Sequence, residues 1–120
     1  MPVPGEEEAR KFLANAPFLW HQQFALAPGV QTPGVNPIEA LLEMSGFPDD
    51  LRGKSVLDIG TTNGAVAFEA ERRGAERVIA VDIYDPDRFG FVALRELFGS
   101  RAAATAAPAR GVADPVRRRP

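Results

Sequence analysis

A strand, a glycine-containing turn, a helix and a second strand follow one another between residues 55 and 82, and this succession constrains the fold most. Residues 55–59 and 77–82 are short runs rich in Val and Ile, which is typical of buried strands. Residues 65–73 have the composition of a helix that ends at Gly74. Such a βαβ unit pairs its two strands in parallel through a right-handed crossover.

Three further helices are predicted outside this unit. The first covers residues 6–15 and has acidic residues in its first turn. The second begins at Asn36, a favourable N-cap, with Pro37 at the first helical position. The third covers residues 88–98 and is followed by a glycine. The expected fold class is therefore α/β, a Rossmann-like parallel βαβ arrangement with N-terminal helices.

The turn after the first strand has the composition of a nucleoside-binding loop. It begins at Asp58 and reads Asp-Ile-Gly-Thr-Thr-Asn-Gly. Gly60 allows a tight turn where a side chain would block a ligand, and Gly64 lets the helix start close to the strand. Asp82 ends the second strand, and its carboxylate suits the two hydroxyls of a ribose. Because parallel sheets bind ligands at the carboxyl ends of their strands, these residues predict a nucleoside site.

Two departures from the dinucleotide-binding pattern indicate which nucleoside is bound. That pattern is G-x-G-x-x-G, whereas here Thr62 occupies the position of the middle glycine. Asp58 places a negative charge where it would repel a pyrophosphate but would suit an ammonium or sulfonium group. The residues therefore favour S-adenosylmethionine over NAD. An NAD-binding oxidoreductase fragment is the weaker alternative.

Residues 56–64 together with Asp82 resemble the first two motifs of class I S-adenosylmethionine-dependent methyltransferases. The resemblance implies that the first acid and its glycine loop hold the methionine end of the cofactor. It also implies that the second acid binds the ribose and that the next residue packs against adenine. The cofactor-binding residues implied in this way are Asp58, Gly60, Thr61, Thr62, Asn63, Gly64, Asp82 and Ile83.

A finer resemblance extends over roughly residues 17–100. Trp20-His21, Gly29-Val30, residues 32–34 and residues 53–60 are similar to the subgroup related to the tRNA wobble-uridine carboxymethyltransferase. This resemblance implies transfer of a one-carbon group from the sulfonium of the cofactor to an acceptor. The acceptor is left open, with RNA and a small molecule both considered, and so is the choice between a plain and a carboxylated cofactor.

The composition changes after residue 100, and this sets the expected boundaries. Residues 1–50 are expected to form a helical and aromatic N-terminal segment, and residues 51–100 part of an S-adenosylmethionine-binding Rossmann-like domain. Residues 101–120 lack aromatic residues and an apolar period, so we expect a disordered tail. Since the family fold continues through further strands, we expect a truncated chain with absent or very weak methyl transfer. A non-catalytic nucleoside-binding remnant or gene fragment is the alternative, and no catalytic residue is assigned.

The composition also disfavours several classes of function. The chain has no cysteine and one histidine, His21, so a tetrahedral metal site is not expected. No apolar run approaches the length that spans a membrane, and the acidic N-terminus does not resemble a signal peptide, so we expect a cytoplasmic protein without membrane association. The net charge of -2 gives no overall attraction to nucleic acid. The oligomeric state is left open.

Overall fold

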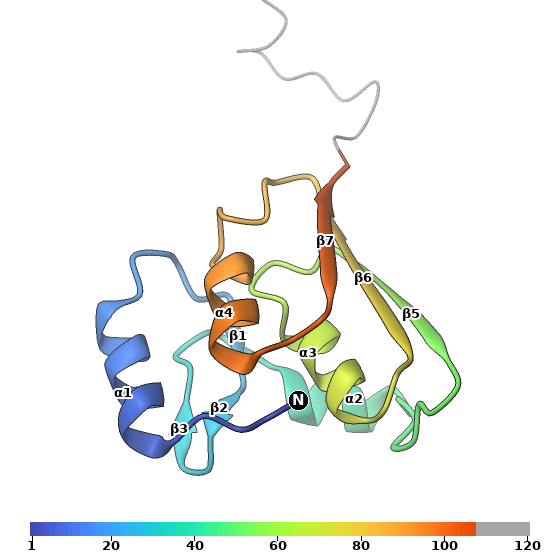
Figure 1. The fold of residues 1–120 in the computed structure, drawn as a ribbon, viewed down its shortest axis with the longest axis horizontal. Helices are drawn as coiled ribbons and strands as arrows, with labels where there is room; N and C mark the ends of the chain where they lie inside the picture. The colour runs from blue at the N-terminus through green and yellow to red at the C-terminus, as the bar shows by residue number, and fades with distance from the viewer. Residues whose placement is uncertain (108–120) are drawn as a thin grey trace, which may run out of the picture.

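A parallel sheet in the order β5-β6-β7 organises the computed structural model, which describes residues 1–107 (Figure 1). A short parallel pair (β1 with β4) and a short antiparallel pair (β2 with β3) precede it in the chain. The helices and strands are α1 (Glu6–Asn15), β1 (Gln22–Gln23), β2 (Ala25–Ala27), β3 (Val30–Gln31), β4 (Asn36–Pro37), α2 (Ile38–Met44), β5 (Ser55–Ile59), α3 (Ala65–Arg72), β6 (Arg77–Asp82), α4 (Phe91–Phe98) and β7 (Ala103–Ala106).

The predicted βαβ unit is confirmed. β5 pairs with β6 in parallel, from Ser55 opposite Arg77 to Ile59 opposite Val81, and α3 forms the crossover. Helices α3 and α4 lie on one side of the strands in Figure 1 and pack together through three buried rings. The ring of Phe68 lies 4.9 Å from that of Phe91 and 5.1 Å from that of Phe98. These rings form the centre of the hydrophobic core.

The expectation that both strands are buried is wrong for β5 and holds in β6 only for Val78 and Ala80. Its side chains alternate between half-buried and exposed, and Leu57 and Ile59 are 59% and 78% exposed. Val56 packs against the core on the side of α3, whereas Leu57 and Ile59 point to the opposite face. No helix in residues 1–107 covers that face, so this apolar strand has one half-buried side and one exposed side.

The expectation that residues 101–120 form a disordered tail is wrong for residues 103–106. Ala103–Ala106 form β7, which pairs in parallel with β6 from Ile79 to Asp82, and the amide of Ala107 donates to the carbonyl of Asp82. An alanine-rich strand has no apolar period, and here the backbone ladder to β6 holds it. The remainder of the expected tail, residues 108–120, lies outside the described residues.

Two predicted helix starts are also corrected. Asn36 does not cap α2, because it belongs to β4 and donates from its amide nitrogen Nδ2 to the carbonyl of His21 at 2.9 Å. The third predicted helix starts at Phe91, not at residue 88, because Gly90 precedes it with a left-handed φ of 78°. A Cβ at Gly90 would collide with the ring of Phe18, so this glycine permits the N-terminal segment to lie against α4.

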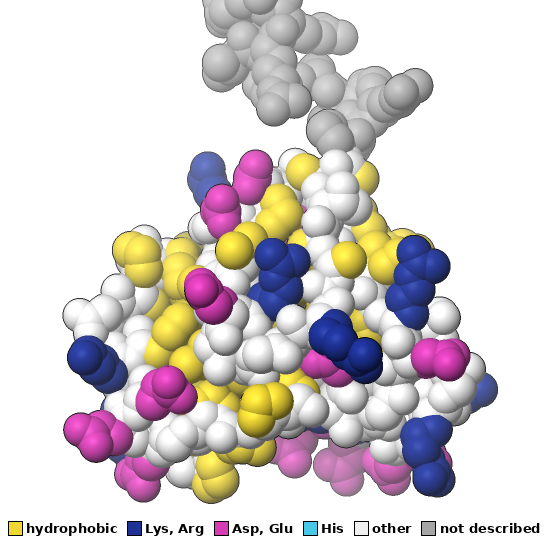
Figure 2. Space-filling model, viewed as in Figure 1, with side chains coloured by type: hydrophobic (Ala, Val, Ile, Leu, Met, Phe, Trp, Pro, Cys, Tyr) yellow, Lys and Arg dark blue, Asp and Glu magenta, His cyan; other side chains and the backbone are white. Residues whose placement is uncertain are grey.

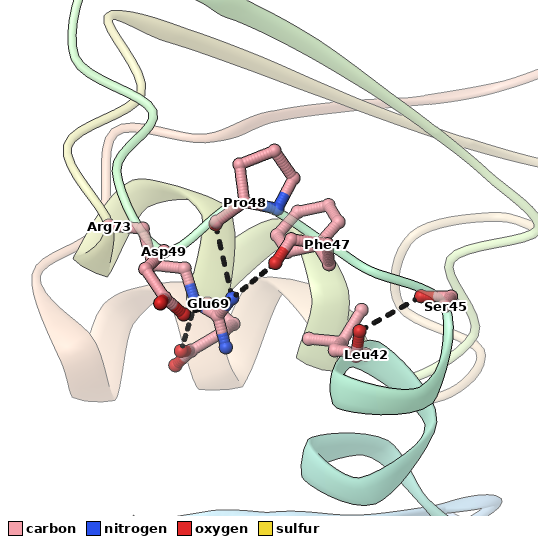
Figure 3. A network of polar contacts seen from close by, with 7 residues as sticks. All are labelled: Leu42, Ser45, Phe47, Pro48, Asp49, Glu69 and Arg73. Atoms are coloured by element: carbon pink, nitrogen blue, oxygen red, sulfur yellow. Dashed lines mark hydrogen bonds and ion pairs between the residues drawn. The ribbon is translucent and has the colours of Figure 1, made fainter.

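Charged side chains are unevenly distributed over the surface. In Figure 2 many acidic side chains gather along the lower edge, over α1 and α2, whereas most basic ones lie over the centre and the right, with a few at the left. The side chain of Arg73 is mostly buried, with 17% of its surface exposed. Arg73 follows α3 and joins this helix to the segment after α2. Its guanidinium donates to the carbonyls of Phe47 and Pro48 in that segment and to the carboxylate of Glu69 in α3 (Figure 3).

None of the helices in residues 1–107 is long and apolar enough to cross a membrane.

Replacement of Arg73 by Met should lower the free energy of unfolding by about 1–3 kcal/mol, because two backbone carbonyls and one carboxylate lose a charged donor. Urea denaturation followed by the fluorescence of Trp20 measures the change. Arg52→Met is the matched control: Arg52 pairs only with Asp50, in full contact with solvent, and its loss should leave stability nearly unchanged. Equal effects of the two replacements would contradict the role of Arg73.

Candidate cofactor site

The loop at residues 60–64 folds back over the carboxyl ends of β5 and β6. The amides of Gly60 and Thr61 donate to the carbonyl of Val81 at 2.7 and 3.2 Å. The amide of Thr62 donates to Oδ2 of Asp82 at 2.9 Å. The two predicted acids, Asp58 and Asp82, are thereby placed on adjacent strands with one short loop between them. This is the position that the sequence predicts for a nucleoside site.

Gly64 has a packing reason that the structure makes explicit. Its φ is 92°, and a Cβ there would lie 2.6 Å from the ring of Phe91 and 2.7 Å from that of Phe68. Helix α3 begins at the next residue, so the glycine brings the start of the helix against the aromatic core. Gly60 also has a left-handed φ, of 77°, but the space around its Cβ position is open. Only the turn itself requires glycine at residue 60.

Asp58 lies partly buried beneath the loop. The hydroxyl of Thr61 donates to its Oδ2 at 2.7 Å. Burial raises the pKa of Asp58 above its usual value and outweighs this hydrogen bond, and the negative charge of Asp82 raises the pKa further. A cationic group beside Asp58 would offset the cost of its buried charge.

Asp82 retains hydrogen-bonding capacity. Its Oδ2 accepts from the amide of Thr62 and its Oδ1 accepts weakly, at 3.3 Å, from the amide of Tyr84. An ionised carboxylate accepts about four hydrogen bonds, so two positions are left for hydroxyl donors. Ile83, the residue that follows, is 56% exposed. Its side chain offers an apolar surface next to the carboxylate.

Thr62 has an unusual conformation for a residue with a side chain. Its φ is 48°, the single left-handed φ of a non-glycine residue within the described part of the chain. Its hydroxyl Oγ1 is buried and finds no partner among the described residues. A left-handed threonine costs on the order of 1–2 kcal/mol. This loop therefore stores strain at the position where the dinucleotide pattern has its middle glycine.

Asn63 is fully buried, and its side chain makes four hydrogen bonds within the fold. Its Oδ1 accepts from the amides of His21 and Gln22 at 2.8 and 3.0 Å. Its Nδ2 donates to the carbonyls of Leu19 and Phe89 at 3.0 and 2.8 Å. Four hydrogen bonds are the full capacity of a primary amide. The side chain of this predicted cofactor residue is thus committed to the fold, and its backbone alone is available to a ligand.

Two residues that sequence reasoning did not assign support the same region. Gln22 is buried and its Oε1 accepts from the amide of Ala65, the first residue of α3. Thr32 is buried as well: its hydroxyl donates to the carbonyl of Gln22 and accepts from the amide of Phe24. The sequence signal was weak, because a glutamine beside aromatic residues and a threonine before Pro33 also fit ordinary packing and turn positions.

An aromatic group borders the loop on one side. The ring of Phe89 lies between those of His21 and Tyr84, with centroids 4.7 and 5.3 Å away and near-perpendicular planes.

A hollow next to this aromatic group is lined by residues that include Thr62, Asp82, Tyr84 and Phe89. A second hollow, of about 560 Å³, lies between the short strands β1–β4 and helices α2 and α3, and none of the predicted site residues lines it. Within residues 1–107 no group of His, Cys, Asp and Glu is arranged to hold a metal ion.

Comparisons with known proteins point to methyltransferases. No family model matches the chain. Over 39 residues, 32% of this chain and 14% of the relative, the chain is 56% identical to the human electron transfer flavoprotein beta subunit lysine methyltransferase. The crystal structure of ribosomal protein L11 methylase from Lactobacillus delbrueckii subsp. bulgaricus matches with a TM-score of 0.51 and 29% identity, over 63% of this chain and 41% of that one.

The two relatives support a class I methyltransferase and a Rossmann-like fold. The chain spans less than half the length of either one. The finer resemblance to the tRNA wobble-uridine subgroup receives no support from these relatives.

Replacement of Asn63 by Ala should lower the free energy of unfolding by about 2–4 kcal/mol, because it leaves two buried amides and two carbonyls without partners. Urea denaturation measures the difference. Asn15→Ala is the control, since Asn15 is exposed and makes one hydrogen bond to the carbonyl of Lys11. A loss at Asn63 no larger than that at Asn15 would contradict the assignment.

Replacement of Asp58 by Asn should make the protein progressively more stable than the wild type as the pH rises above about 3.8. The folded state raises the pKa of this carboxyl, so the folded protein binds the proton more tightly than the unfolded chain does. The stability that comes from the protonated group is present at low pH and is lost as the pH rises through the folded pKa. Urea denaturation of both proteins between pH 3 and pH 8 tests this, and a pH-independent difference would contradict it.

Proposed function

We propose that residues 56–83 bind S-adenosylmethionine and that the chain is the cofactor-binding part of a methyltransferase. The observation that carries the proposal is the pair of carboxylates, Asp58 and Asp82, at the carboxyl ends of adjacent parallel strands, joined by a loop that starts at Gly60. The similarity of the chain to methyltransferases supports the same proposal.

The residues present fit the parts of this cofactor. Asp58 would face the positively charged methionine end, where a cation offsets the cost of a buried carboxylate. Asp82 would accept from the ribose hydroxyls at its two remaining positions, and Ile83 would lie against the adenine. The hydroxyl of Thr62, which lacks a partner, would gain one from the ligand. Thr61, Asn63 and Gly64 would contribute the backbone and shape of the loop.

The loop is poorly suited to NAD. A pyrophosphate requires free backbone amides at the turn. Here the amides of residues 60 and 61 donate to Val81, that of residue 62 donates to Asp82, and that of Gly64 donates to the carbonyl of Thr61. These four engaged amides and the nearby negative charge of Asp58 disfavour a diphosphate in this loop. NAD-dependent oxidation therefore stays the weaker candidate.

When bound, S-adenosylmethionine supplies a methyl group on a sulfonium, and the task of the protein is to align it with an acceptor. The two relatives are named as methyltransferases of a lysine and of a ribosomal protein, so we propose a polypeptide acceptor. The wobble-uridine resemblance stays a prediction, as do a cytoplasmic location and the use of a carboxylated cofactor. We assign no candidate base among residues 1–107. A nucleoside-binding remnant without turnover is the alternative.

Titration calorimetry with S-adenosylmethionine should show binding to the wild type that is about ten- to a hundredfold weaker in Asp82→Ala, since a charged hydrogen bond contributes about 1.5–3 kcal/mol. Asp87→Ala is the control, because Asp87 is an exposed acid in the loop that follows β6. Circular dichroism shows whether each variant is folded.

Equal binding of NAD, or full affinity in Asp82→Ala, would contradict the assigned site. A folded wild type that binds S-adenosylmethionine without methylating any polypeptide would favour the remnant. If neither S-adenosylmethionine nor NAD binds detectably, the proposal that residues 56–83 form a nucleoside site is wrong.

A further inference from the structure

Asn63 is followed by a glycine, and this pair has a reactivity that the other asparagines of the chain do not share. Asn15 is followed by alanine and Asn36 by proline. The backbone nitrogen of the next residue can attack the side-chain carbonyl carbon of an asparagine, which starts deamidation. Glycine hinders this approach least because it has no side chain, and proline has no N–H to lose. Asn63 is therefore the asparagine with the most reactive neighbour.

Deamidation of Asn63 needs water and no other reactant. The nitrogen of Gly64 forms a bond to Cγ of Asn63 and closes a succinimide ring. The side-chain nitrogen leaves as ammonia and takes the proton that the nitrogen of Gly64 gives up. Water then adds to one of the ring carbonyls and breaks its bond to nitrogen. The product is an aspartyl residue or, if the main-chain carbonyl is attacked, an isoaspartyl residue.

The fold holds both reacting groups away from this reaction. The side chain of Asn63 is fully buried, and four backbone groups hold its Oδ1 and Nδ2 at 2.8 to 3.0 Å. The amide of Gly64 donates to the carbonyl of Thr61 at 2.8 Å. The nitrogen of Gly64 must give up this hydrogen bond, and the carboxamide must leave its partners, before the two can react. Attack therefore requires that the loop at residues 60–64 open.

The N-terminal residues 18–22 control this opening. Three of the four hydrogen bonds of Asn63 lead to residues 19–22. Next to them, the ring of Phe18 lies against Gly90 and 4.8 Å from the ring of Trp20. Undocking of residues 18–22 would release three bonds at once and would leave the ladder between β5 and β6 in place. A local opening of this kind needs less free energy than unfolding of the whole chain.

We propose that Asn63 is a deamidation site which residues 18–22 protect while they are docked, and that the converted loop cannot regain its native fold. Deamidation is then fast in the unfolded chain and slow in the folded protein, and the undocking of residues 18–22 sets its rate there. The inference is independent of the proposed function, because no ligand enters it.

The product does not fit the site that Asn63 leaves. A carboxylate has no N–H to donate, so the carbonyls of Leu19 and Phe89 would face an oxygen in place of Nδ2 at a fully buried position. Burial of a charge without a partner of opposite charge is strongly unfavourable. An isoaspartyl residue would also lengthen the main chain within the loop. Since the loop contacts both Asp58 and Asp82, the candidate site would be lost with it.

Mass spectrometry of the full 120-residue chain after incubation at pH 8 measures conversion at each asparagine, with digestion at acidic pH to stop the reaction. In guanidinium chloride Asn63 should convert at least about tenfold faster than Asn15, and Asn36 slowest. In native buffer the rate at Asn63 should fall on the order of a hundredfold. The rate at Asn15, which is exposed, should fall less. Equal rates at Asn63 in the folded and unfolded chain would overturn the proposal.

Two phenylalanine truncations test the role of residues 18–22. Phe18→Ala weakens their docking without contact to Asn63 and should raise the native rate at Asn63 about tenfold. Phe47→Ala is the matched control, because Phe47 is also a partly buried ring but packs against Arg73 in the segment after α2. Its rate should stay near that of the wild type. Equal acceleration in both variants would assign the opening to global unfolding and would overturn local protection.

Refolding tests whether the conversion is irreversible. After dilution from denaturant at neutral pH, Asn63→Asp should not regain the native fluorescence of Trp20, whose ring packs on that of Phe18. Asn15→Asp is the control and should regain it, since Asn15 makes one exposed hydrogen bond to the carbonyl of Lys11. Native fluorescence in Asn63→Asp would contradict the claim that the converted loop cannot refold.

Discussion

The buried amide of Asn63 is the interaction on which the geometry of this protein depends. It gathers three segments that lie far apart in the sequence: residues 19–22, the loop at residues 60–64, and Phe89. Each of its four hydrogen bonds has a backbone group as partner, so the segments are fixed in position and not merely in contact. The loop that carries the candidate site is therefore held on one side by Asn63 and on the other by Asp82, which accepts from Thr62.

The sequence predicts those parts of the fold that local pattern determines. The strands at residues 55–59 and 77–82, the helix between them and their parallel pairing follow from apolar runs and glycine positions within one short stretch. The pairing of Asp58 and Asp82 follows from the same topology. The four bonds of Asn63 could not be predicted, because its partners lie 26 to 44 residues away and are backbone groups that every residue type carries.

Two sequence predictions, the disordered tail and the burial of β5, were wrong for different physical reasons. The strand at Ala103–Ala106 depends on backbone pairing with β6, and alanine leaves no pattern of burial to detect. The exposure of Leu57 depends on which elements cover the sheet, and composition within the strand carries no information on that point. The prediction that Asn36 caps a helix failed for a third reason. Its side chain donates to the carbonyl of His21, and the residue belongs to β4 instead.

The separation in sequence between Asn63 and its N-terminal partners has a consequence for the order of folding. β5 and β6 meet through a register of 22 residues, with α3 between them, whereas the bonds from Asn63 to residues 19–22 close loops of 41 to 44 residues. Contacts of longer range form later, since more chain entropy is lost before they stabilise the structure. We therefore expect the sheet and its helix to form before the N-terminal segment docks. In that order of events the loop at residues 60–64 acquires its final shape only in the last step, so the candidate site is the part of the described fold that we expect to form last.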